Sequence, residues 1–390
     1  MPLRPQRAGS DIFGLEYYCM KLAIVVPGGV DRSGEYRVIP SVLALIRRLA
    51  RTNEVHVFAL AQEPKPARWE LAGAQIHNIG HRHTRWRAVA AIVAEHRRSR
   101  FALVQAIWSG ACGQIAVSAA CLLRLPSCVH VAGGELVALR DIHYGGRLHW
   151  YGRLAEAVVL RLASTVTAAS QPMVDSIAAL GIEAELVPLG VDLDTWPPRA
   201  PVRRDVNLPA RLLHVASLNR VKDQTTLFKA LAILRDSGVA FSLDAVGEDT
   251  LNGEIQALAR QLGIAQQVAF HGFLTHGQLR PLMEAADLLV MSSRHEAGPI
   301  VMLEAAIVGV PTVGTAVGHI AEWAPEAAVA VPVGDSESLA MAIGRVLGDE
   351  PTRLELAKSA QQRAIAIEGA FMNDEIAAAF RLQRTQAPSA

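Results

Sequence analysis

The 390-residue chain has few cysteines, few aromatic residues and almost no net charge. Its four cysteines include no C-x-x-C pair, which argues against a disulfide framework and against a zinc site of the usual spacing. Cys112, Cys121 and Cys128 lie in apolar stretches, where we expect buried, reduced thiols in a reducing compartment. A formal net charge of +1 gives no reason to expect a nucleic-acid partner.

Targeting and membrane-spanning segments are also missing from the sequence pattern. Residues 1–19 lack the apolar core of a signal peptide, so we expect a mobile extension or a segment upstream of the natural start. Residues 101–123 carry no charge, but polar residues and glycines interrupt them, which favours a buried strand, turn and helix over a membrane span. We therefore expect a soluble, cytoplasmic protein.

A dinucleotide-binding fingerprint is absent as well. Residues 27–34 contain Gly28 and Gly29 but not the G-x-G-x-x-G spacing, and no acidic residue stands at the end of the second expected strand. This disfavours a nicotinamide or flavin dehydrogenase. We expect Gly28 and Gly29 to let the backbone approach a bulky ligand in a cleft.

What the chain does have is a large hydrophobic fraction, 51%, and strand-like and helix-like segments that alternate from end to end. This alternation predicts an α/β protein with doubly wound parallel sheets, and the length predicts two domains. Strands are expected near 22–27, 54–60, 74–79, 101–107, 127–132, 164–168 and 185–188, and then near 211–216, 241–246, 267–270, 287–292, 311–314 and 328–331. Helices fill the gaps, for example 36–51 and 171–180.

The predicted organisation has five parts. Residues 1–19 are the extension, and residues 20–193 form a Rossmann-like acceptor-side domain. Residues 194–208 include a proline-rich linker, and residues 209–368 form the second domain. Residues 369–390 are expected to be a helix and tail that packs back on the first domain. Such an arrangement leaves a cleft between the domains.

The most informative stretch follows the apolar strand near 287–292. Glu296 and Glu304 stand eight positions apart across Gly298 and Pro299. Pro299 suits the first turn of a helix, and the positive end of that helix, with Ile300 close by, favours a phosphate. Glu296 then lies in a loop at the carboxyl end of a strand, where open α/β sheets bind ligands. A solvated helix residue and a loop charge are the alternative interpretation of the two acids.

Further candidate residues follow other expected strands. After the first strand of the second domain come Ser217, Arg220 and Lys222, and the two cations could clamp a diphosphate. His130 and Glu135 end a first-domain strand and could contact the sugar or the acceptor, although a core histidine is an equal alternative for His130.

Metal-binding patterns are unconvincing. Asp192 and Asp194 form a D-x-D sequence at the linker, outside a nucleotide-binding domain, and we regard it as coincidental. His77, His81 and His83 stand among arginines, which would repel a metal ion, so we expect a solvated basic face. No metal ligands are predicted.

Taken together, these features resemble the family-4 (group 1) retaining glycosyltransferases, which have the two-domain GT-B fold. The resemblance is strongest over residues 212–322 and continues more weakly over residues 22–192. It rests first on Glu296 and Glu304, which match the family's E-x7-E motif. Supporting matches are Glu304-Ala305 followed by Gly309-Val310-Pro311, the V-G-H-I-A-E of residues 317–322, Phe270-His271-Gly272, Lys222, and Pro188-x-Gly190-Val191-Asp192.

This resemblance implies a metal-independent hexosyltransferase that needs no cofactor and uses a nucleotide diphosphate sugar as co-substrate. Glu296 would touch donor-sugar hydroxyls, Glu304 the ribose, and Lys222 the diphosphate. Backbone groups near His271 and Gly272 would lie close to the base. The acceptor would be a glycan, a lipid-linked sugar or a small molecule.

The chain departs from the family pattern at three places. Ser217 stands where relatives often have an arginine, so Arg220 would supply that charge or the clamp is weaker. Pro299 has no N–H for a phosphate, so Ile300 and its neighbours must serve. The family's histidine near the end of the 127–132 strand falls on Ala132, which leaves the role of His130 open.

Two rival functions share this architecture: an epimerase or hydrolase of nucleotide sugars, and a non-catalytic sugar-nucleotide-binding protein. Charge is divided unevenly, because residues 1–200 hold 22 Lys/Arg against 16 Asp/Glu (+6) and residues 201–390 hold 16 against 21 (−5). The basic residues 82–100 include Trp86, Val89, Ile92 and Val93. They are interpreted either as a peripheral contact with an anionic membrane or as an ordinary amphipathic surface helix.

Overall fold

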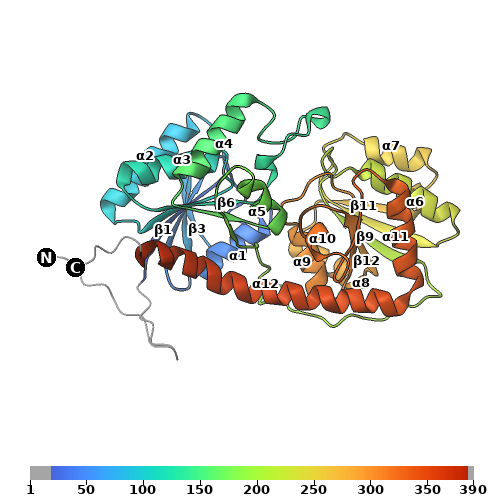
Figure 1. Cartoon of the computed structure of the whole chain (residues 1–390). Helices are drawn as coiled ribbons and strands as arrows, with labels where there is room; N and C mark the ends of the chain where they lie inside the picture. Colours follow the sequence, from blue (N-terminus) through green and yellow to red (C-terminus); the bar gives the residue numbers. More distant parts are fainter. Residues whose placement is uncertain (1–18, 385–390) are drawn as a thin grey trace.

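The computed structural model describes residues 19–384, with side chains as far as residue 367. Two α/β domains lie side by side, each built on a twisted sheet with helices on both faces (Figure 1). The predicted architecture of two doubly wound domains is confirmed. Residues 1–18 of the extension predicted for residues 1–19, and the tail of residues 385–390, lie outside the described residues.

The first domain contains an eight-stranded sheet in the order β3-β4-β2-β1-β5-β6-β7-β8, parallel except where β3 pairs with β4. The strands are β1 (Lys21–Val26), β2 (Glu54–Ala59), β3 (Ala67–Leu71), β4 (Ala74–Asn78), β5 (Leu103–Ile107), β6 (Ser127–Val131), β7 (Thr165–Ala168) and β8 (Glu185–Leu186). The helices are α1 (Pro40–Leu49), α2 (Thr84–Arg98), α3 (Ala111–Leu123), α4 (Trp150–Leu162) and α5 (Gln171–Ala178), with the 3-10 turns η1 (Gly134–Leu136) and η2 (Arg140–Ile142).

The second domain contains a six-stranded parallel sheet in the order β11-β10-β9-β12-β13-β14. The strands are β9 (Ala210–Val215), β10 (Phe241–Val246), β11 (Val268–Gly272), β12 (Leu288–Met291), β13 (Thr312–Thr315) and β14 (Val329–Val331). The helices are α6 (Gln224–Asp236), α7 (Glu254–Gln261), α8 (His276–Ala285), α9 (Ile300–Ile307), α10 (Gly318–Trp323) and α11 (Ser336–Gly348), with the 3-10 turn η3 (Ala265–Gln267).

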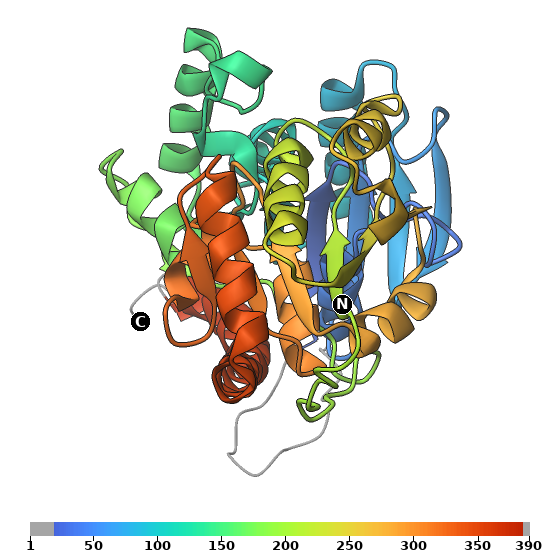
Figure 2. The same cartoon turned by 90° about the vertical axis from the view of Figure 1, so that its right-hand side faces the viewer.

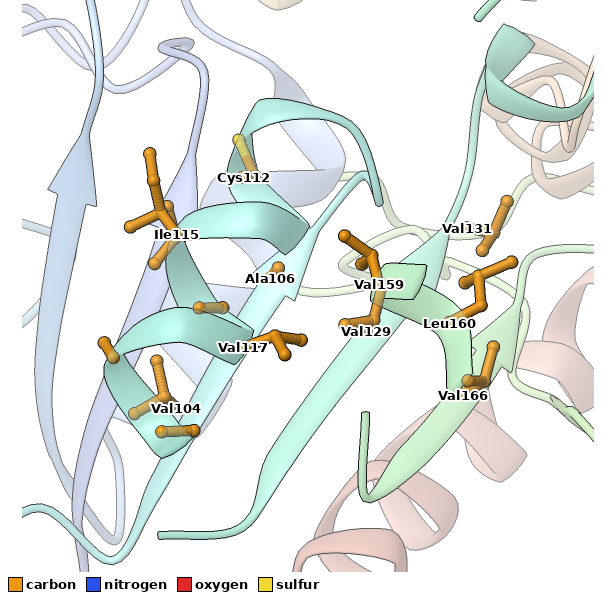
Figure 3. Close-up of a cluster of buried hydrophobic side chains, with 14 of the residues drawn as sticks. Val104, Ala106, Cys112, Ile115, Val117, Val129, Val131, Val159, Leu160 and Val166 are labelled. Carbon is orange, nitrogen blue, oxygen red and sulfur yellow. The ribbon is translucent and has the colours of Figure 1, made fainter. Parts of the chain in front are cut away.

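Apolar strands buried on both faces explain why these sheets form where the sequence predicts them. All six residues of β1 are buried, as are all four of β12, and such continuous apolar runs are typical of central parallel strands. Figure 3 shows part of the first-domain core, where Val117 of α3 and Val159 and Leu160 of α4 pack among strand residues. Burying each such side chain stabilises the fold by about 1.5–3 kcal/mol.

Helix α12 (Glu350–Arg384) belongs in its first turns to the second domain and then continues beneath the first domain (Figure 1). Figure 2 views it close to end-on. The helix predicted for residues 369–390 is thus the continuation of a helix that begins at Glu350. Buried Arg353 anchors its start by donating to the carbonyl groups of Asp287 and Val202.

Each predicted strand has a counterpart, but one strand was missed and two local predictions are wrong. The antiparallel edge strand β3 was not predicted. Cys121 is exposed on α3, whereas Cys112 and Cys128 are buried as predicted. The helix predicted over residues 36–51 begins only at Pro40, because Arg37 adopts a left-handed backbone conformation.

Helix α2 also differs from the interpretation of residues 82–100 as a membrane-contacting face. Ile92 is fully buried and Val89 packs against the core, so the apolar stripe of α2 faces inward. Trp86 is exposed and Val93 is half-buried, so two of the four apolar side chains named for this face, Val89 and Ile92, belong to the core. Among the described residues, no helix combines the length and the apolar character needed to cross a membrane.

Candidate active site

A cavity of about 700 Å³ lies between the two domains. Its second-domain wall consists of residues that follow the carboxyl ends of β9, β10 and β11, together with the start of α9. Its first-domain wall comes from the loop before α1 and from α1 itself, and residues 190–195 close it where the chain crosses between domains. Strand ends of an open α/β sheet are the usual position of a ligand site.

The lysine and the first glutamate of the predicted site are in contact. Lys222 Nζ donates to Glu296 Oε1 at 2.6 Å, and Ser293 Oγ donates to the same oxygen at 2.6 Å. Ser292 Oγ in turn donates to the Lys222 carbonyl at 2.8 Å, which ties the loop after β12 to the loop after β9. These bonds hold a cation and a carboxylate together at the ends of two neighbouring strands.

The second glutamate is buried in α9 and lines the cavity. Glu304 Oε1 lies 2.8 Å from His276 Nε2 at the start of α8. The backbone carbonyl of Glu304 accepts a hydrogen bond of 2.9 Å from the indole of Trp196. Trp196 belongs to the crossing segment, residues 190–196, where the chain passes from the first domain to the second. A buried carboxylate without a partner would be costly, so His276 stabilises Glu304 when no other donor occupies the cavity.

The start of α9 is one residue later than predicted. Pro299 has φ −70° and ψ 111°, so it is the N-cap residue, and the helix begins at Ile300. Ile300, the first residue of α9, lines the cavity. Gly298 is required by close packing, since a Cβ atom there would lie 3.0 Å from His319 Nε2 and 3.2 Å from the Ala169 carbonyl of the first domain.

The other predicted donor-side residues occupy different positions. Ser217 lines the cavity. Arg220 does not face it, because its guanidinium donates to Glu254 at 2.6 Å on the exposed start of α7. His271 Nε2 lies 2.7 Å from Asp244, and Gly272 has φ +66°; the cavity wall is formed by the next residues, 273–277.

On the first-domain side, the glycine-rich loop is tied to its own domain. Buried Gln62 accepts from the amide groups of Gly29 at 2.7 Å and Val30 at 3.0 Å. A Cβ atom on Gly29 would lie 2.4 Å from Ile39, and its φ of +80° independently favours glycine. A Cβ atom on Gly28 would lie 3.2 Å from the Gln62 side chain. The glycines therefore serve the packing of this loop.

His130 in β6 and Glu135 in η1 are not among the residues that line the cavity, and they differ in what holds them. His130 is fully buried, with Nδ1 2.9 Å from Thr167 Oγ1 and Nε2 without a partner, and burial lowers its pKa to about 4. Glu135 accepts from the Ser109 amide at 3.2 Å, while its buried Oε2 has no partner. Burial, aided by the nearby Glu156, raises the pKa of Glu135 to about 7.

Two contacts across the cleft were not predicted. Arg294 Nη2 donates to Asp141 Oδ1 at 3.1 Å, and His295 Nε2 lies 3.1 Å from the Gly133 carbonyl. His276 was likewise missed. Arg294 and His295 directly precede Glu296, and His276 follows β11 by four residues, so the rule that strand ends bind ligands could have drawn attention to all three.

The histidines predicted to form a solvated basic face divide into two groups. His81 and His83 are exposed, but His77 is buried, so for His77 the prediction is wrong. His77 Nε2 lies 2.9 Å from His56 Nδ1, and buried Glu95 approaches both. Lys21 Nζ binds Glu95 at 3.1 Å and Glu54 at 3.1 Å, so the Glu95 carboxylate already has a cationic partner in this cluster.

Comparisons with known proteins agree with this geometry. The family described as "Glycosyl transferases group 1" matches residues 203–363, and "Glycosyl transferase 4-like domain" matches residues 38–190. The chain is 31% identical over 214 residues to a glycogen synthase of Mycobacterium tuberculosis, covering 53% of this chain and 51% of that protein. The chain thus spans about half the length of the curated relatives it matches.

Solved structures extend the likeness of the fold to nearly the whole chain. Sucrose-phosphate synthase from Thermosynechococcus elongatus superposes with a TM-score of 0.76 at 19% identity, covering 94% of this chain and 100% of that one. Anabaena HepE in complex with UDP-glucose superposes with a TM-score of 0.67 at 20% identity, covering 92% and 100%. The two matched regions fall on the two sheets, and the chain belongs to the group 1 glycosyltransferases with the GT-B fold.

Proposed function

We propose that this protein transfers a hexosyl group from a nucleotide diphosphate sugar to a glycan, lipid-linked or small-molecule acceptor, with retention of anomeric configuration and without a metal ion. The observation that supports this most is the Lys222–Glu296 contact of 2.6 Å beside the start of α9. A cation for the diphosphate and a carboxylate for the sugar thereby stand together in the loops after β9 and β12, and Ser217 and Ile300 of the same two segments line the cavity with Glu304.

Breaking the bond between the anomeric carbon and the diphosphate builds negative charge on the leaving group. Lys222 and the amide groups at the start of α9 supply positive charge and hydrogen-bond donors for it. Glu296 holds the sugar hydroxyls and keeps the ammonium of Lys222 in position. These groups are preorganised by Ser292 and Ser293, so little reorganisation is needed when the donor enters.

The nucleoside part of the donor occupies the cavity between the domains. Glu304 binds the ribose hydroxyls, and the His276 imidazole must then share or release that carboxylate. The base lies against residues 273–277, next to His271 and Gly272. HepE, whose structure holds UDP-glucose, has the same fold and supports a nucleotide sugar as the donor class.

The first test is thermal unfolding of the full chain with UDP-, GDP- and ADP-sugars. A donor that binds only the folded state raises the midpoint by mass action. We expect sugars of one nucleotide class to raise the unfolding midpoint strongly, both in the presence of EDTA and in the presence of magnesium. Protection by none of the donors, or protection that disappears with EDTA, contradicts the proposal.

The second test separates transfer from hydrolysis and epimerisation. Nucleotide release from the protecting donor is measured with and without a panel of sugar, glycan and lipid-linked acceptors, and the anomeric configuration of the product is read by NMR. We expect acceptor-dependent release and a retained configuration. Equal release without any acceptor identifies a hydrolase, and an altered donor sugar identifies an epimerase.

A further inference from the structure

Helix α4 exposes an apolar stripe that nothing in the described residues covers. Trp150, Tyr151, Leu154, Val158 and Leu162 are between 45% and 69% exposed. From Tyr151 onward they follow one another at intervals of three or four residues, so they lie on one face of the helix. The opposite face is anchored in the core by buried Val159 and Leu160 (Figure 3).

Basic side chains accompany this stripe. Arg161 is exposed beside the stripe, where its guanidinium also donates to the Leu180 carbonyl at 3.1 Å, Arg153 is exposed on another face of α4, and Arg147 precedes the helix. The only acid of the helix, Glu156, is buried and accepts a hydrogen bond from Ser109 Oγ. The outward face of α4 therefore combines two aromatic rings and three aliphatic side chains with positive charge and no exposed carboxylate.

We propose that this face of α4 docks on an anionic lipid bilayer. Helices that lie in the plane of a membrane interface have aromatic and aliphatic side chains on one side and arginines flanking them. Trp150 and Tyr151 suit the headgroup level because each ring is apolar at one end and polar at the other. Arg161, at the edge of the stripe, is long enough to reach lipid phosphates while its stem rests on apolar surface.

A second copy of this chain fits the stripe less well. A two-fold contact would place the same surface on both partners, and it would bring the arginines of one helix close to those of the other. Without exposed acids on α4, these charges would repel. An anionic lipid surface satisfies both the apolar and the charged side chains.

The position of α4 connects this surface to the cleft. Ser109 donates through its hydroxyl to Glu156 of α4 and through its amide to Glu135 in η1. The segment between η1 and α4 also carries Asp141, which pairs with Arg294 of the donor-side loop. A protein docked through α4 holds its cleft near the lipid headgroups, where it would meet a lipid-linked acceptor. This last step rests on the proposed function, but the docking does not.

The test is cosedimentation of the full chain with sucrose-loaded vesicles of phosphatidylcholine alone or mixed with phosphatidylglycerol, without sugars. We expect binding to the anionic vesicles that weakens with added salt, and little binding to neutral ones. Leu154→Glu should weaken binding roughly tenfold or more, because that leucine no longer enters the apolar boundary. The matched control is Leu122→Glu on α3, which is 68% exposed but lies outside the stripe.

Three results overturn the proposal: no wild-type binding to anionic vesicles, an equal loss in both variants, or dissociation of a wild-type dimer by Leu154→Glu in light scattering. Unfolding midpoints and donor protection of both variants verify that the fold and the cleft are intact. Failure of the docking is therefore distinguishable from failure of the proposed glycosyl transfer, which would appear as absent donor protection in all three proteins.

Discussion

Arg294 and Asp141 join the two domains by a salt bridge, with Nη2 and Oδ1 3.1 Å apart. Arg294 belongs to the loop that carries Glu296, and its backbone amide donates to the Val221 carbonyl at 2.7 Å, next to Lys222. The residues that would hold the sugar and the diphosphate are thus attached directly to a contact that crosses the cleft.

Removing this salt bridge should open the cleft. We expect Asp141→Ala to increase the radius of gyration measured by small-angle X-ray scattering, since one contact between the domains is lost. Arg294→Ala should do the same, and the double variant should add little because both substitutions break one interaction. Glu63→Ala breaks the Arg32–Glu63 pair inside the first domain and serves as the control. Unchanged scattering for Asp141→Ala would show that other contacts hold the domains together.

Lys222→Ala should slow the reaction rather than unfold the protein. A charge-assisted hydrogen bond contributes about 1.5–3 kcal/mol, so kcat/KM should fall by roughly ten- to a hundredfold. Steady-state kinetics with the protecting donor measures this. Lys229 is exposed on α6 and provides the matched control, Lys229→Ala. A rate for Lys222→Ala equal to that of the control would remove Lys222 from the mechanism.

Glu304→Gln should mainly raise the KM for the donor. The amide keeps the shape of the side chain but loses the charge that would bind two ribose hydroxyls, so donor binding should weaken by about 1–2 kcal/mol with kcat little changed. The split between KM and kcat separates this role from that of Lys222. Glu355→Gln, at an exposed position of α12, is the control. A donor KM insensitive to Glu304→Gln would make Glu304 an ordinary buried residue bound to His276.

Glu135 should make the folded state less stable as the pH rises. Its pKa is raised by burial to about 7, so between pH 5 and 7 the folded protein binds a proton that the unfolded chain has released. Stability attributable to this carboxyl is therefore present at low pH and lost as the pH rises through that window, by an amount on the order of 1–3 kcal/mol.

Chemical denaturation at a series of pH values measures this effect. Glu135→Gln cannot ionise, so its stability relative to wild type should increase from pH 5 to pH 7. Histidines such as His130, whose pKa burial lowers to about 4, are present in both proteins and cancel in the difference. Parallel curves for wild type and Glu135→Gln would mean that Glu135 is ionised throughout.

The parallel strands could be predicted from the sequence because a strand that is buried on both faces consists of a continuous apolar run, as in β1 and β12. Strand β3 could not be predicted in this way, because its residues alternate between half-buried and exposed at the antiparallel edge of the sheet. The burial of His77 was missed for a related reason: its hydrogen-bond partner His56 lies on the neighbouring strand β2, and no local pattern connects them.

The candidate site was predicted where a motif within one loop and helix defined it, as for Glu296 and Glu304. Pairings between distant segments could not be predicted. Arg220 binds Glu254, 34 residues away, and Arg294 binds Asp141, 153 residues away. The packing of whole domains determines such pairs. That packing cannot be deduced from a local pattern of residue types.

The crossing segment has a mechanical consequence. Asp192 forms a salt bridge with Arg47 of α1, and four residues later the Trp196 indole donates a hydrogen bond to α9. The stretch of backbone between these two anchors that can serve as a hinge is therefore very short. Arg47, Asp192 and Thr195 also line the cavity. We expect the part of the cavity beside this segment, which would hold the nucleoside of the proposed donor, to change shape least when the domains rotate. The largest displacements should then occur far from this segment, so that a nucleotide could bind before the site around the sugar closes.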